Sequence, residues 1–112
     1  MKLREIAHSR TGDKGNTSNI SVIAFEQANY DFLREQVTAD RVKALFAGIV
    51  QGNVTRFELP TMGALNFVLK ETLGGGVTRS LALDAHGKSL SSALLDLDLP
   101  EAPHIARRDA EM

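Results

Sequence analysis

The sequence predicts an α+β fold, a two-layer sandwich in which helices cover one face of a mostly antiparallel sheet. Two observations carry this prediction. Patterns typical of strands and helices follow in the order strand, strand, helix, strand, helix, strand, strand, without the strict alternation of a parallel doubly wound fold. The 112 residues, of which 43% are hydrophobic, suffice for one ordinary core. We therefore expect a single domain over residues 1–100 and a flexible tail over residues 101–112.

The first two predicted strands flank a polar segment. "KLREIAH" (2–8) and "ISVIAF" (20–25) are the strand candidates, the second because it combines β-branched and aromatic residues. Between them, "HSRTGDKGNTSN" (8–19) contains almost no apolar side chain. We expect this segment to form a polar loop that joins the two strands.

Two helical segments, or one broken helix, are predicted next. Apolar residues recur at spacings of three and four between residues 32 and 49, which is typical of a helical stripe. The helices should occupy residues 30–47 and break at Val37 and Thr38, with Thr38 as the N-cap of the second segment. Gly48 is expected to supply a left-handed stop.

The rest of the chain predicts a strand, a helix and a closing strand. "GNVTRFELP" (52–60) alternates with the period of a strand, which Pro60 ends. "MGALNFVLKETLGGG" (62–76) predicts a helix that three glycines stop, with Leu65, Val68, Leu69 and Leu73 on its apolar face. "TRSLALDAHGKSL" (78–90) holds an Asp-Ala-His-Gly turn candidate, and "LLDLDLP" (94–100) alternates leucine and aspartate. We expect at least one closing strand in this part of the chain.

Charge and composition argue against several classes of function. The formal net charge of -1 gives no broad attraction to nucleic acid or to an anionic membrane. The chain has no cysteine, no secretory signal and no apolar run of membrane-spanning length, so we expect a cytoplasmic protein. The three histidines, His8, His86 and His104, are scattered, so we expect no metal site, and we expect no cofactor.

The first candidate site is the polar segment after the first strand. "RTGDKGN" (10–16) holds two glycines that permit tight turns, together with Arg10 and Lys14 to attract an anion and Asp13 to orient them. A loop of this kind can hold a carboxylate or a phosphate. The alternative is a glycine-rich β-hairpin whose Asp13 and Lys14 face water.

The second candidate site is "LGGGVTRS" (73–80). Gly74, Gly75 and Gly76 would let a ligand approach the backbone, and Arg79 and Ser80 supply donors for an oxyanion. The alternative is a flexible helix stop before a strand. If both segments lie at the same end of the sheet, one acidic ligand would be bound by Arg10, Lys14, Asn16, Asn19 and Arg79.

The residues give no strong catalytic pattern. His8, Ser9 and Asp13 are close in sequence, but neighbouring residues of an extended chain point to opposite faces, which spoils a hydrogen bond between serine and histidine. Asp13 and Lys14 remain weak candidates for proton transfer.

The motifs together resemble a known family. "IAHSRTGDKGNTSNISVIA", "FLREQVTADRVKALFAGIVQGNVTRFEL" and "LPTMGALNFVLKETLGGGVTRSLALDAHGKSLSSALL" are similar to the ferredoxin-fold domain at the C-terminus of proteins like AtuA, the acyclic terpene utilisation protein. The resemblance extends over about residues 2–99. In that family the first motif commonly reads Arg-Ser-Gly-Asp-Lys-Gly, and here Thr11 keeps a hydroxyl before the glycine.

The resemblance implies a ferredoxin-like sandwich and an association with the catabolism of branched acyl-CoA or terpenoid acids. The residues that it carries across as ligand- or partner-binding are Arg10, Gly12, Asp13, Lys14, Gly15, Asn19, Asn66, Gly74, Gly75, Gly76, Arg79 and Ser80. AtuA-like proteins usually carry a large core domain before this one, whereas this chain begins at Met1. It is therefore expected to be a split subunit or an independent homo-oligomer.

Three functions follow as hypotheses. The first is an accessory subunit that binds a separately encoded AtuA-like core protein and helps to bind a carboxylate or a CoA thioester through the glycine-rich loops. The second is a small lyase or hydratase in which Asp13 and Lys14 exchange protons beside an anion held by Arg10 and Arg79. The third is a homo-oligomerisation module whose open sheet face forms the interface.

Overall fold

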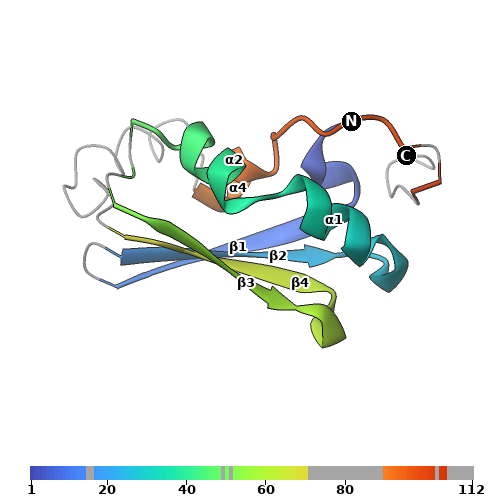
Figure 1. Cartoon of the computed structure of the whole chain (residues 1–112), viewed down its shortest axis with the longest axis horizontal. Helices are drawn as coiled ribbons and strands as arrows, with labels where there is room; N and C mark the ends of the chain where they lie inside the picture. Colours follow the sequence, from blue (N-terminus) through green and yellow to red (C-terminus); the bar gives the residue numbers. More distant parts are fainter. Residues whose placement is uncertain (15–16, 49, 51, 71–89, 103, 106–112) are drawn as a thin grey trace.

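The computed structural model describes residues 1–14, 17–48, 50, 52–70, 90–102 and 104–105. In this part of the chain, an antiparallel sheet of order β1-β2-β4-β3 is covered by helices on one face (Figure 1). The strands are β1 (Ala7–Lys14), β2 (Thr17–Ala24), β3 (Val54–Leu59) and β4 (Ala64–Leu69). The α-helices are α1 (Tyr30–Gln36), α2 (Ala39–Leu45) and α4 (Leu90–Leu94). The predicted α+β class, with helices on one face of the sheet, is confirmed.

The polar segment after the first apolar residues is part of a β-hairpin. Strand β1 pairs with β2 from Ala7 and Ala24 to Lys14 and Thr17. The segment is therefore a β-hairpin, which is the predicted alternative, and the long loop is wrong. The N-terminal strand also begins later than predicted, because Leu3–Glu5 forms a 3-10 helix. Backbone pairing satisfies the amides and carbonyls of this polar segment regardless of its side chains, which is why a polar sequence can be strand.

The paired helices match the prediction closely. Helix α1 ends at Gln36, and the Thr38 side chain accepts a hydrogen bond of 3.2 Å from the Arg41 amide at the start of α2. The predicted left-handed stop at Gly48 is wrong, because α2 is capped by Phe46 at φ -105°. Among the described glycines, the one with positive φ is Gly63, at 63°.

The predicted helix over residues 62–76 is wrong, because its first part is strand β4. The side chains of Leu65, Phe67 and Leu69 are all 0% exposed and alternate with Asn66 and Val68. This period of two is that of a strand, whereas the prediction relied on the helical spacing of Leu65, Val68 and Leu69. A 3-10 turn, Pro60–Met62, and Gly63 reverse the chain so that β4 pairs with β3.

Residues 94–100 form no strand of the described sheet, whereas residues 78–89 of the predicted closing region lie outside the described residues. Helix α4 includes Leu94, and residues 95–99 then run beside the N-terminal segment (Figure 1). The Leu3 amide donates to the Leu97 carbonyl at 2.9 Å, and the Leu99 amide donates to the Met1 carbonyl at 2.7 Å. Leu94 and Leu99 are buried, and this burial holds the segment on the helical layer.

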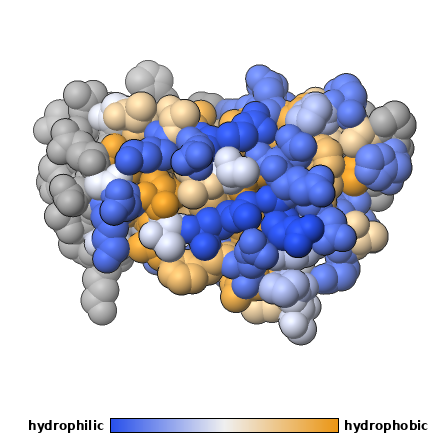
Figure 2. Space-filling model, viewed as in Figure 1, coloured by the Kyte–Doolittle hydropathy of each residue, from blue (hydrophilic) through white to orange (hydrophobic). Residues whose placement is uncertain are grey.

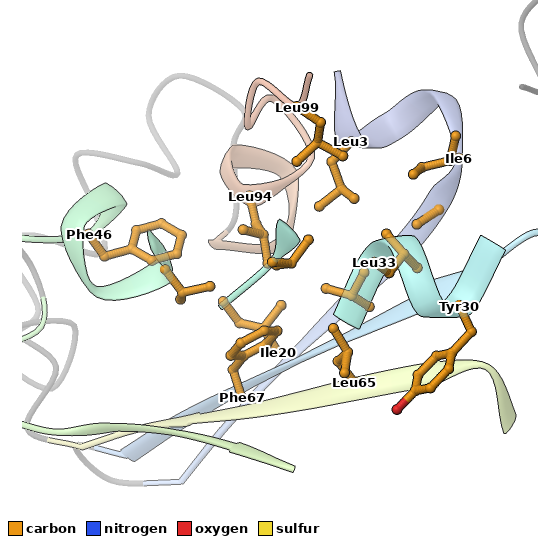
Figure 3. Packing of buried hydrophobic residues seen from close by; sticks show 14 of the residues in the cluster. Leu3, Ile6, Ile20, Tyr30, Leu33, Phe46, Leu65, Phe67, Leu94 and Leu99 are labelled. Atoms are coloured by element: carbon orange, nitrogen blue, oxygen red, sulfur yellow. The ribbon is translucent and has the colours of Figure 1, made fainter. Parts of the chain in front are cut away.

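The core lies between the sheet and the helices. Ile20, Leu65 and Phe67 point from the sheet toward Leu33 and Leu94 (Figure 3). Ala102 and Ile105, from the predicted tail, are also buried, whereas residues 103 and 106–112 lie outside the described residues. The tail as a whole stays a prediction.

Candidate functional site

One face of the sheet carries no described helix, and we call it the open face (Figure 1). Its residues alternate with the buried ones of the core, and antiparallel pairing aligns them in rows across the four strands. The central row is Arg10, Ser21, Asn66 and Phe57. On either side lie the rows Gly12, Asn19, Val68, Thr55 and His8, Ile23, Ala64, Leu59.

Four of the predicted site residues meet on this face: Arg10, Gly12, Asn19 and Asn66. Arg10 and Asn19 are exposed, and Asn66 is half-buried. A Cβ atom at Gly12 would lie only 3.4 Å from both terminal amide atoms of Asn19. The glycine therefore lets the Asn19 amide lie close over β1.

Arg10 is the described arginine with no recorded partner. The other described arginines bind acidic side chains or backbone carbonyls, as in the pairs Arg34–Asp31 at 3.7 Å and Arg56–Glu58 at 3.1 Å. No position that the strand registers assign to the open face holds Asp or Glu. A guanidinium in such surroundings is suited to bind a carboxylate or a phosphate from outside the domain.

Asp13 and Lys14 are the last two residues of strand β1. The backbone of Asp13 pairs with that of Ser18, and the backbone of Lys14 pairs with that of Thr17. Their side chains lie outside what the structure describes, so proton exchange between them stays a prediction.

The second glycine-rich segment lies outside the described residues, as do Gly15 and Asn16 of the first. This applies to the predicted site residues Gly74, Gly75, Gly76, Arg79 and Ser80. The described residues on either side of the second glycine-rich segment both contact the half of the β1–β2 hairpin that leads to residues 15–16. Leu69 pairs with Ser18 in β2, and the Ser91 amide donates to Thr11 of β1. The convergence of the two segments stays a prediction.

Thr11 has a structural partner that the motif did not reveal. Its Oγ1 accepts a hydrogen bond of 2.7 Å from the Ser91 amide, in the first turn of helix α4. The hydroxyl of the first motif therefore anchors α4 to β1. Sequence reasoning missed this role because the two residues are 80 positions apart.

A second feature missed from the sequence is an apolar edge, formed by Phe57, Leu59 and Met62. Their exposed fractions are 50%, 38% and 64%. The alternation of β3 was recognised, but its apolar side is the exposed one. Arg56 takes the covered side instead, where its Nη1 donates to the carbonyls of Arg34 and Val37 at 2.5 and 3.0 Å.

The side of the molecule with helices α1 and α2 is different in character. Hydrophilic residues dominate the centre of Figure 2, where these helices meet the edge strand β3. Asp31 and Glu35 of α1 and Asp40 of α2 are exposed. These acidic residues belong to the helical layer, not to the open face.

The Tyr30 hydroxyl, in the helical layer, has a shifted pKa. Burial raises the pKa of Tyr30, with a further upward contribution from Glu58. The Tyr30 hydroxyl is buried and has no hydrogen-bond partner among the described residues. This group does not contribute to the open face.

No group of three metal-binding side chains occurs in the described ranges. None of the helices described there has the length and apolar character needed to cross a membrane.

Comparison with known families gives one match that spans most of the chain. A family model described as the AtuA ferredoxin-like domain matches residues 1–100. Neither the curated proteins nor the solved structures gave a match.

Proposed function

The chain belongs to the AtuA ferredoxin-like domain family, and on this premise we propose that it is an accessory subunit of a separately encoded AtuA-like core protein. The complex would act in the catabolism of branched acyl-CoA or terpenoid acids. In this proposal the open face supplies a cation and amide donors, either to a carboxylate or CoA-type anion or to the core protein itself.

The observation that carries the proposal is the shared position of Arg10, Asn19 and Asn66. Three residues from different strands lie on one solvent-facing surface, in adjacent rows. Arg10 has no recorded partner within the described part of the chain. An exposed guanidinium that shares a sheet face with two amide side chains is a simple binding surface for a carboxylate.

The composition of the open face favours an accessory role over a stand-alone lyase or hydratase. Such an enzyme would need a proton-transferring group beside the bound anion. No strand position that the registers assign to the open face holds Asp or Glu. In the proposed complex, the core protein supplies the catalytic groups.

The test is recovery of the partner from the native cell extract. The affinity-tagged chain is used as bait, captured proteins are identified by mass spectrometry, and the chain alone is analysed by size-exclusion chromatography with light scattering. We expect an AtuA-like core protein in stoichiometric amount. If no such protein is recovered and the chain alone is a stable homo-oligomer, the accessory role is wrong and the oligomerisation module replaces it.

Ligand binding is tested on the purified complex by calorimetry with a branched acyl-CoA. Arg10→Ala is expected to weaken binding by about 1.5–3 kcal/mol if the guanidinium contacts the anion. Lys43→Ala is the matched control, since Lys43 is an exposed cation of the helical layer. Equal affinities in both variants would exclude Arg10 from the anion site.

A further inference from the structure

We infer that the open face is the surface on which the core protein packs, with the apolar edge buried and Arg10 paired with a carboxylate of the partner. The inference rests on the proposed accessory role and names its contact surface. The occupant is a protein surface that is apolar opposite β3 and acidic opposite β1.

The first argument is the distribution of exposed apolar side chains. In the described part of the chain, the large hydrophobic residues that are exposed are Leu45, Phe57, Leu59 and Met62. Three of these four belong to the apolar edge. Clustered exposed apolar groups that include an aromatic side chain are typical of the centre of a protein interface.

The second argument is charge. The open-face strand positions include Arg10 and His8, and none of these positions holds Asp or Glu. A partner with its own cations there would leave Arg10 buried and unpaired, which is costly. A carboxylate of the partner satisfies the guanidinium.

The same charge pattern argues against a second copy as the occupant. In a two-fold pair of open faces, each copy offers the other the same set of positions. None of those positions provides an acidic side chain for Arg10. A different protein can provide one.

The third argument is size. With strands about 4.8 Å apart and residues about 3.3 Å apart, four strands of six residues span roughly 19 by 20 Å. A standard interface buries about 800 Å² on each partner. The flat area of the open face, roughly 380 Å², is smaller than this. Such a contact therefore covers the whole face, with Arg10 at one sheet edge and Phe57 at the other, and extends beyond it.

The test uses the purified core protein as the probe and measures its affinity for four variants of this chain. Phe57→Asp and Arg10→Glu alter the open face. Leu45→Asp and Lys43→Glu are matched controls, because they introduce the same side chains on α2, in the helical layer. We expect each open-face variant to bind at least about tenfold more weakly than wild type, and each control to bind within about twofold.

A second measurement keeps the test valid if a variant fails to fold. Hydrogen exchange of the wild-type chain, alone and with the core protein, should show new protection in β1 and β3 and none in α2. If the wild type binds the core protein while the open-face variants bind equally well and protection lies in the helices, the contact surface is wrong but the accessory role stands. If the wild type does not bind the core protein, both the accessory role and this inference fail. A homodimer that Phe57→Asp dissociates would then assign the open face to a second copy.

Discussion

The hydroxyl of Thr11 is predicted to stabilise the fold, and Thr11→Val tests this. Valine keeps the size and the β-branched shape of threonine, so strand propensity and packing change little. The substitution removes the acceptor for the Ser91 amide. That amide belongs to a residue that is only 8% exposed, in a helix of five residues.

The expected loss follows from two contributions. A neutral hydrogen bond contributes about 0.5–1.5 kcal/mol, and a buried donor left without a partner costs about 1–3 kcal/mol. Fraying of a short helix lets water reach part of the freed amide, so we expect a loss of about 1–2 kcal/mol in the free energy of unfolding. With a urea m-value of about 1–2 kcal/mol/M, the midpoint should fall by roughly 1 M.

The assay is urea unfolding of the wild type, Thr11→Val and Thr11→Ser, followed by circular dichroism. Serine retains the hydroxyl, so Thr11→Ser should be within about 0.5 kcal/mol of the wild type. A Thr11→Val protein as stable as the wild type, or a Thr11→Ser protein as unstable as Thr11→Val, would refute the structural role. Binding of the core protein by folded Thr11→Val should be unchanged, since this side chain is not on the open face.

Three further substitutions test other parts of the structure. Gly63→Ala should cost about 1–2 kcal/mol, because φ is 63° and the new Cβ would lie 2.8 Å from Oε1 of Gln27; an unchanged thermal midpoint would contradict this. Arg56→Met should cost about 1.5–3 kcal/mol in urea unfolding, because it removes a charged donor from two carbonyls at the end of α1 while keeping the apolar stem; Lys43→Met is the control. Tyr30→Phe should leave stability at neutral pH unchanged or higher, because the buried hydroxyl has no partner among the described residues. Above pH 10.0 the unfolded chain loses the Tyr30 proton more readily than the folded chain, because the folded pKa is raised. The free energy of unfolding of the wild type should therefore fall as the pH rises. If that of Tyr30→Phe fell equally steeply above pH 10.0, this explanation would be wrong.

Local signals in the sequence predicted the elements whose pattern is unambiguous. The break between α1 and α2 was found because Thr38 is a typical N-cap that follows an apolar stripe. The two-layer arrangement was predicted because strand patterns both precede and follow the helix patterns along the chain. Strand β4, which contains Leu65, Phe67 and Leu69, was missed because the apolar residues of this stretch also fit the spacing of a helix. The period of the apolar residues alone does not distinguish a buried central strand from a buried helix.

The candidate site was predicted in composition but not in form. Arg10, Gly12 and Asn19 were found from the polar motif, but the motif forms paired strands instead of a loop. Which face of β3 is exposed depends on Arg56 reaching the carbonyls of α1, a contact across 22 residues that no local pattern encodes. The partner of Thr11 is equally remote.

The pairing of the N-terminal segment with residues 95–99 has a consequence for synthesis. Arg4 and Asp96 form an ion pair although 92 residues separate them, and the backbone around Leu3 bonds to the same late segment. On the ribosome, the β1–β2 hairpin and both helices α1 and α2 emerge while Leu3 still lacks its cover. Contacts between such distant residues form slowly, and an incomplete chain exposes apolar surface in the meantime. Residues 95–99 thus close the core around the N-terminal segment, and a nascent chain of this domain exposes apolar surface until these residues have left the ribosome.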